Sequence, residues 1–175
     1  MGDVIDAIHA LDDAVDKWLE GHRSDRLDRL FYGLSSAADH GLLWHALGAL
    51  RALRRREPGY ALRFSTLLGI ESGITNGLVK SLFRRGRPPE HFSHNDPLPF
   101  GMRRPITSSF PSGHAATAFM CAVLLSKDNR TGPAYFTLAA LVASSRVYTR
   151  MHHASDVAAG AVLGLVLGAA ARSRI

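Results

Sequence analysis

Two histidines and several cations, spread over three separate stretches, have the side chains needed to bind and attack a phosphate group. The first stretch, residues 80–88, reads KSLFRRGRP, so Lys80 ends an expected helix and Arg87 lies in a turn that Pro88 stiffens. A lysine and an arginine held close together form an anion clamp, because the guanidinium fork matches two phosphate oxygens. Alone, the stretch is equally typical of a basic flank that meets lipid headgroups.

The second stretch, residues 109–115, reads SFPSGHA and is typical of a helix start. Pro111 and Ser112 are the expected cap, with Gly113 and His114 in the first turn. Free amides at a helix N-terminus bind phosphate oxygens, and glycine lets a ligand come close. Beside a bound phosphate, His114 would favour its protonated form and could donate that proton. A capping serine followed by an interfacial histidine is the simpler interpretation.

The third stretch, residues 145–156, reads SRVYTRMHHASD, with Arg146 before a turn and His152 four residues before Asp156. On a helix this spacing puts two side chains on one face, so the carboxylate could bond one imidazole nitrogen and leave the other to attack. A His–Asp helix cap without a chemical role explains the pattern equally well. Only His152 has the spacing, so it is the predicted nucleophile, with His153 as second choice.

Neither a metal site nor a nucleic-acid surface is indicated. The nine histidines include no HExxH pattern, and His152 and Asp156 lack a third ligand at fixed spacing, so we expect no metal and no cofactor. The net charge is +6, but the basic residues cluster at 51–63 and 80–104. These clusters lack the interleaved aromatic side chains of a strand-binding surface, so we expect no nucleic-acid partner.

In this order the motifs K-x6-RP, PSGH and SR-x5-H-x3-D resemble the signature of the type 2 phosphatidic acid phosphatase and vanadium haloperoxidase superfamily. The resemblance covers residues 80–156 and implies a membrane lipid phosphatase that forms a phosphohistidine, with three cations offsetting the charge on the phosphoryl group. It assigns phosphate binding to Lys80, Arg87, Ser112, Gly113 and Arg146, proton donation to His114, nucleophilic attack to His152, and orientation of that histidine to Asp156.

The elements that must position these residues are expected to be helices of a single domain, residues 1–175. Residues 1–22 form an amphipathic helix with apolar residues opposite acids, too polar to span a membrane. In the core, residues 28–175, the expected spans are 30–53, 60–83, 112–126, 133–148 and 155–171, with active-site loops at 84–111 and 146–156. Gly160, Gly164 and Gly168 give the last helix a face that another backbone can approach.

The predicted fold class is therefore all-α: a polytopic membrane bundle of about five transmembrane helices plus an N-terminal interfacial helix. The arginines between 51 and 63 and those at 172 and 174 favour a cytoplasmic location for both segments. Five spans then place both active-site loops on the extracytoplasmic face of the plasma membrane, although Arg23, Arg26 and Arg29 favour the opposite orientation. A soluble helical bundle is the alternative, because the spans are short and interrupted by charge.

The predicted function is hydrolysis of a phosphate or diphosphate from a membrane lipid. Polyprenyl diphosphate is the first substrate choice, phosphatidate or phosphatidylglycerophosphate the second, and a decaprenylphosphoryl-phosphoribose lipid the third. The alternatives of other classes are a vanadate-dependent haloperoxidase, a soluble acid phosphatase and a non-catalytic lipid-binding membrane protein. The lipid bilayer is the expected partner, and the sequence leaves the oligomeric state open.

Overall fold

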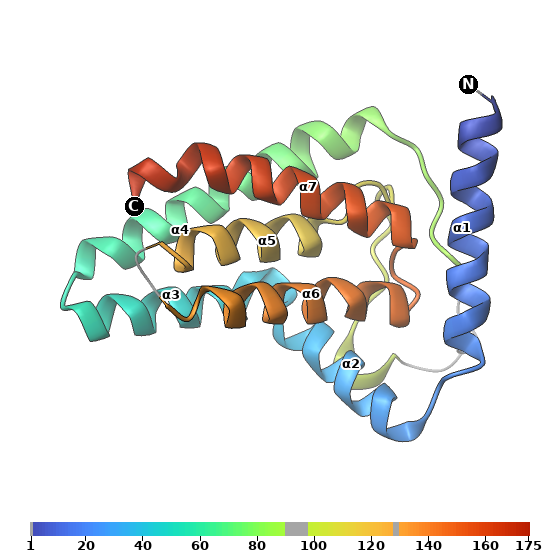
Figure 1. Cartoon of the computed structure of the whole chain (residues 1–175), viewed down its shortest axis with the longest axis horizontal. Helices are drawn as coiled ribbons and strands as arrows, with labels where there is room; N and C mark the ends of the chain where they lie inside the picture. The colour runs from blue at the N-terminus through green and yellow to red at the C-terminus, as the bar shows by residue number, and fades with distance from the viewer. Residues whose placement is uncertain (1, 90–97, 128–129) are drawn as a thin grey trace.

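The computed structural model describes residues 2–89, 98–127 and 130–175, and these residues form helices and no strand. The main helices are α1 (Gly2–Glu20), α2 (Asp25–Ala37), α3 (Leu42–Arg55), α4 (Pro58–Ser72), α5 (Gly113–Leu125), α6 (Gly132–Tyr148) and α7 (Ala154–Ala171). The prediction of an all-helical fold is confirmed, and helices α3 to α7 run alongside one another (Figure 1). Residues 90–97 of the predicted loop 84–111 lie outside the described residues.

The alanine-rich helix α5 lies at the centre of the bundle, between α6 and α7 (Figure 1). Most of its residues are buried, because small side chains let neighbouring helices approach from several sides. A methyl carbon at Gly164 of α7 would lie 2.9 Å from the Cα of Ala116 and closer still to its carbonyl oxygen. A methyl carbon at Gly160 would likewise overlap the carbonyl oxygen of Ser112. The predicted close-approach face of α7 is therefore confirmed, and it packs on α5.

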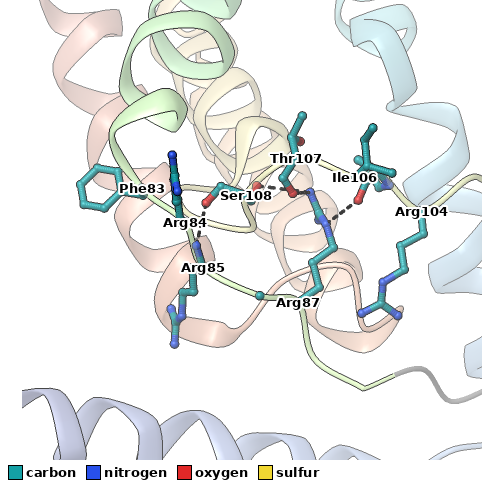
Figure 2. A pocket seen from close by; sticks show the side chains of 10 residues that line it. Phe83, Arg84, Arg85, Arg87, Arg104, Ile106, Thr107 and Ser108 are labelled. Carbon is teal, nitrogen blue, oxygen red and sulfur yellow. Dashed lines mark hydrogen bonds between the residues drawn. The ribbon is translucent and has the colours of Figure 1, made fainter.

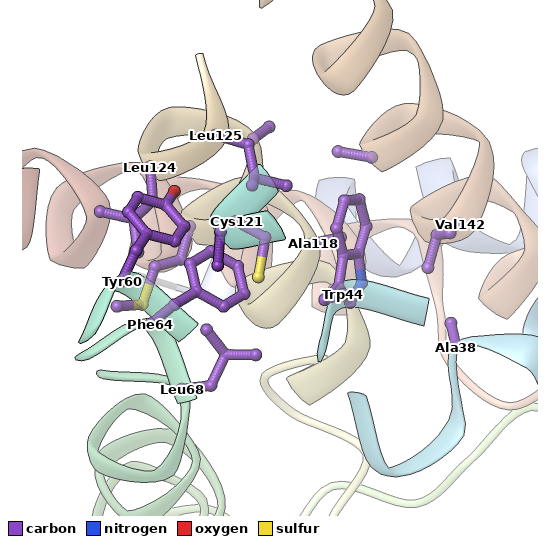
Figure 3. Packing of buried hydrophobic residues seen from close by; sticks show 14 residues of the cluster. Ala38, Trp44, Tyr60, Phe64, Leu68, Ala118, Cys121, Leu124, Leu125 and Val142 are labelled. Atoms are coloured by element: carbon purple, nitrogen blue, oxygen red, sulfur yellow. The ribbon is translucent and has the colours of Figure 1, made fainter. Parts of the chain in front are cut away.

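Aromatic side chains from α3 and α4 fill the space beside α5. Tyr60, Phe64 and Leu68 of α4 surround Cys121, while Trp44 of α3 lies beside Ala118 (Figure 3). Phe64 is fully buried. This cluster fixes α3 and α4 against the helix that begins with the PSGH motif.

Residues 30–53, predicted as one span, do not form one continuous helix. The chain forms two helices, α2 and α3, which meet at a short 3-10 turn, Asp39–Gly41. His40 has φ 54° and Gly41 has φ 72°, both in the left-handed region, and this interrupts the helical hydrogen bonds. The predicted span 60–83 is instead continuous, because α4 runs on through a π-helical segment, Gly73–Val79, and a 3-10 turn, Lys80–Leu82.

Helix α1 has the predicted amphipathic pattern and lies across the end of the bundle at which α6 ends and α7 begins (Figure 1). Its buried residues are the acids Asp12 and Asp16, whereas apolar residues such as Leu11 and Trp18 are exposed. Among the described residues, one helix, Ala154–Arg174, is long and apolar enough to cross a membrane, and Gly113–Leu125 is apolar but shorter. The number of spans is therefore not fixed by helix length and composition.

Candidate active site

A cavity of about 990 Å³ opens where the three sequence motifs meet. Six of the eight predicted site residues line it: Lys80, Arg87, Gly113, His114, Arg146 and His152. The other two, Ser112 and Asp156, are fully buried behind its wall. Residues separated by more than 70 positions in the sequence thus share one cavity.

The N-terminus of α5 forms one wall of the cavity. Ser112 is the predicted cap: its hydroxyl accepts a hydrogen bond from the amide of Ala115 at 3.4 Å, and its own amide donates to the carbonyl oxygen of Asp156 at 3.0 Å. Gly113 packs so closely that a Cβ there would lie 2.6 Å from Oδ1 of Asn76. The amides of Gly113 and His114 lack partners within the helix and remain suited to an anion.

The turn after α6 brings His152 to the cavity. Arg150 has φ 57°, a left-handed conformation that reverses the chain, and the amides of Met151 and His152 donate to the carbonyl oxygen of Arg146 at 3.0 and 3.1 Å. Helix α1 holds this turn, because Asp16 and Glu20 bind the Arg150 guanidinium at 3.0 and 2.8 Å. The strained conformation of Arg150 is thus supported by two ion pairs from a distant helix.

His152 and Asp156 lie close together, as predicted, but they do not share one helix face. His152 precedes α7, His153 is the N-cap of that helix, and the Asp156 carboxylate caps it by accepting from the His153 amide at 2.9 Å. The His152 Nδ1 lies 3.8 Å from the Asp156 carboxylate, too far for a hydrogen bond, but only 2.7 Å from the carbonyl oxygen of Ser109. Because a carbonyl only accepts, Nδ1 donates, and Nε2 is the basic nitrogen.

Burial also sets the charge of His152, whose side chain is 3% exposed. Removal from water lowers the pKa of His152 to about 3, and the positive charges of Arg146, Arg87 and Lys80 act in the same direction, against the Asp156 carboxylate. His152 is therefore neutral at pH 7, which is the form that a nucleophile requires.

Arg87 ties together the loops around the cavity. Its guanidinium donates to the carbonyl oxygens of Pro105 at 3.0 Å, Met151 at 2.5 Å, Thr107 at 3.2 Å and Ser108 at 3.4 Å. A second cavity, of about 490 Å³, lies on the side of Arg87 where Arg84 and Arg104 also contribute to the lining (Figure 2). The predicted phosphate ligand therefore also has a structural task, and most of its N–H groups have backbone partners.

The other two cations keep more of their donors. Arg146 is buried, donates to the hydroxyl of Ser35 and lies 3.9 Å from Asp39, while its Nε has no hydrogen-bond partner among the described residues. Lys80 donates to Oδ1 of Asn76 at 3.2 Å, which leaves two of its three hydrogens. Both side chains can therefore bind the oxygens of an anion in the cavity.

Three residues at the site were not predicted from the sequence. Arg85 binds Asp156 and the acid Asp12 of α1, each at 2.6 Å, and Asp12 also accepts from the amide of Ser155 at 2.9 Å. Asp39 lies 2.8 Å from Nε2 of His114. The signal for Asp12 was the acidic face of the amphipathic helix, and Arg85 stood inside the K-x6-RP motif, at a position counted as variable.

Comparison with known proteins shows which family has this arrangement of motifs. The family model of the PAP2 superfamily matches residues 60–174. Decaprenylphosphoryl-5-phosphoribose phosphatase of Mycobacterium tuberculosis is 31% identical over 141 residues, which cover 78% of this chain and 74% of that protein. Lipid A 1-phosphatase of Porphyromonas gingivalis is 40% identical over 77 residues, but the chain spans only 17% of that protein.

The fold has a solved counterpart as well. The crystal structure of a transmembrane PAP2 type phosphatidylglycerolphosphate phosphatase from Bacillus subtilis superposes with a TM-score of 0.74 and 24% identity, covering 96% of this chain and 86% of that one. The prediction of a phosphatase enzyme is confirmed. The chain belongs to the PAP2 superfamily.

Proposed function

We propose that the chain removes a phosphate from a membrane lipid through a phosphohistidine on His152, without a metal ion. The observation that carries the proposal is the shared cavity, whose lining includes both predicted histidines, His114 and His152, and the predicted cations Lys80, Arg87 and Arg146. The surroundings of the two histidines differ, since His152 is bonded to a neutral carbonyl and His114 to a carboxylate. Different surroundings suit different tasks, one as nucleophile and one as acid.

The proposed first step is transfer of the phosphoryl group to the enzyme. Lys80, Arg146 and the remaining N–H of Arg87 bind the non-bridging oxygens, together with the free amides at the start of α5. Nε2 of His152 attacks phosphorus, the bond to the leaving oxygen breaks, and His114 protonates that oxygen. Water then hydrolyses the N–P bond and releases inorganic phosphate. The fixed cations offset charge on the transferring group, as metal ions do elsewhere.

The proposed substrate is a prenyl lipid with a terminal phosphate. From the histidines the cavity extends between α3 and α4, past Trp44, Leu68 and Gly69 as well as the polar His45 and Ser65, which gives a lipid chain a partly apolar path. The similarity to decaprenylphosphoryl-5-phosphoribose phosphatase over most of both chains moves such a phosphoribose lipid ahead of polyprenyl diphosphate, our first choice from the sequence. Phosphatidylglycerophosphate and phosphatidate follow.

The proposed location is the plasma membrane, with several spans and the site on the extracytoplasmic face. The hydrophobic core of a bilayer is about 30 Å thick, whereas a helix rises 1.5 Å per residue. The 17 and 18 residues of α6 and α7 thus come close to spanning it, and the 13 residues of α5 lie between them. The α2–α3 pair and the continuous segment 58–82 complete the five proposed spans.

The test is a substrate panel with the full chain purified in detergent. Release of inorganic phosphate is measured from the phosphoribosyl prenyl lipid, polyprenyl diphosphate, phosphatidylglycerophosphate and phosphatidate. His152→Ala and His114→Ala are each expected to lose at least about 100-fold in kcat, while His153→Asn, which keeps a capping side chain, stays active. With substrate labelled in its phosphate, an acid-labile label should appear on the wild-type protein. Most activity retained by His152→Ala would refute the nucleophile.

A further inference from the structure

The kink between α2 and α3 brings an acid into the cavity. A continuous helix over residues 30–53 would need no left-handed residue, yet His40 and Gly41 both adopt that conformation. For a residue with a side chain this conformation costs about 1–2 kcal/mol, so the surrounding structure must impose it. Asp39, immediately before the two, lines the cavity. The strain is thus stored next to an acid that none of the three motifs contains.

Asp39 makes one close contact, with the histidine of the PSGH motif. Its Oδ1 lies 2.8 Å from Nε2 of His114 and 3.9 Å from the Arg146 guanidinium. The neighbouring turn of α2 adds to the arrangement, because Ser35 accepts a hydrogen bond from Arg146. One segment therefore contacts both the histidine from α5 and the arginine from α6.

This contact determines which nitrogen of His114 is available. A carboxylate only accepts, so Nε2 donates its hydrogen to Asp39. The other nitrogen, Nδ1, has no protein partner among the described residues. A nearby carboxylate also stabilises the positive charge of an imidazolium, as in hydrolases in which an acid orients a histidine.

The remaining charges near His114 make this stabilisation necessary. Lys80 and Arg146 act on His114 from the 3-10 turn after the π-helix and from α6. Arg87, Arg103 and the neutral His152 line the same cavity, as do His40 and His45. On the side of α4, Glu71 is occupied by the hydroxyls of Thr75 and Thr117. Asp39 is therefore the acid positioned to offset these cations at the His114 ring.

We propose that Asp39 is a positioning residue for the general acid His114. It fixes the ring through Nε2 and stabilises the proton that Nδ1 delivers to the leaving oxygen as the P–O bond breaks and the bond from His152 to phosphorus forms. The inference rests on the proposed function. It adds that protonation of the leaving group depends on an acid outside the family motifs.

The test compares leaving groups, since only a poor leaving group needs a proton. With an alkyl phosphate, Asp39→Asn is expected to lower kcat by about 100-fold, the lower end for general acid catalysis. With 4-nitrophenyl phosphate, whose leaving anion is stable, kcat should stay within about threefold of the wild type. The alkaline limb of the rate profile for the alkyl substrate should also move to lower pH. Asp25→Asn, an exposed acid of α2, is the matched control and should match the wild type throughout.

Several outcomes separate the possibilities. Equal loss on both substrates, or no loss on either, overturns the role of Asp39 while leaving the phosphatase intact. If Asp39→Asn does not fold, judged by circular dichroism, Asp39→Glu and Asp39→Ala with added formate replace it. Asp39→Glu, and Asp39→Ala with formate, are each expected to show part of the wild-type activity on the alkyl phosphate. The absence of this activity in both refutes the inference. A wild-type protein that releases phosphate from no substrate refutes the proposed function itself.

Discussion

Substitution of Gly164 by alanine tests whether the packing of α7 on α5 fixes the active site. The added methyl would lie 2.9 Å from the Cα and carbonyl carbon of Ala116, about 0.5 Å inside ordinary contact, and closer still to the carbonyl oxygen. These atoms are backbone, so no side chain can rotate away and the helices must separate. Overpacking costs about 1–3 kcal/mol, and alanine regains about 1 kcal/mol of helix propensity. With the overpacking cost at its upper end, about 3 kcal/mol, the net loss in the free energy of unfolding is about 2 kcal/mol.

The assay is thermal unfolding of the detergent-solubilised protein, followed by circular dichroism. A loss of about 2 kcal/mol corresponds to roughly 4–8 °C in Tm for a domain of this size. Gly73→Ala is the matched control, because a methyl there meets nothing within 4 Å. Gly160→Ala should add a loss of activity, since its methyl would overlap the carbonyl oxygen of Ser112, directly before the PSGH helix. An unchanged Tm for Gly164→Ala would refute the packing argument.

Three further predictions concern the chemistry of the site. A chelator such as EDTA should leave phosphate release largely unchanged, and a complete loss that only a divalent ion restores would contradict the metal-free mechanism. Arg85→Met leaves two buried carboxylates without their countercharge, so we expect a destabilisation of about 3–5 kcal/mol, seen as a lower Tm, and an unchanged Tm would contradict it. Because the pKa of His152 is about 3 in the folded protein and about 6.5 when unfolded, the unfolded state binds more protons below pH 6.5. The free energy of unfolding should thus fall by up to about 1.4 kcal/mol per pH unit as the pH drops from 6.5 to 3. When the free energy of unfolding is measured from pH 7 to pH 5, His152→Gln should remove the part of this pH dependence that His152 causes.

Much of the fold could be predicted because its signals are local. Apolar runs and capping residues lie within a few positions of one another, so the N-cap of α5 at Ser112 and the bounds of α6 and α7 followed from the sequence to within about two residues. The small-residue spacing of α7 likewise predicted a close backbone approach. The number of predicted spans placed the two active-site loops on one face, but the meeting of the motifs in one site came from the family resemblance, since no local rule brings residue 80 to residue 152.

The kink at Asp39 could not be predicted, because hydropathy over a window averages out single backbone conformations. The segment kept enough apolar residues to read as one span, and the polar pair Asp39 and His40 appeared only as an interruption. What gives the kink its importance is His114, 75 residues away. Such contacts depend on tertiary packing that periodicity does not describe.

The contacts of α1 with the turn that carries His152 could not be predicted for the same reason. The helical period of α1 predicts an acidic face, and surface acids usually face water. In the structure Asp12 and Asp16 are buried instead, against Arg85 and Arg150. Which partner a charged helix face selects is a property of the assembled fold.

Arg85 and Arg87 are two residues apart, yet they differ in what surrounds their positive charges. Two carboxylates neutralise the charge of Arg85. Arg87 instead donates hydrogen bonds to uncharged backbone carbonyl groups, which fix the position of its guanidinium and leave its positive charge in place. Arg87 therefore behaves like a stationary cation built from the chain itself, with no need to reorient while negative charge moves past it. A lysine at residue 87 would keep the sign of the charge and lose the fork that immobilises it.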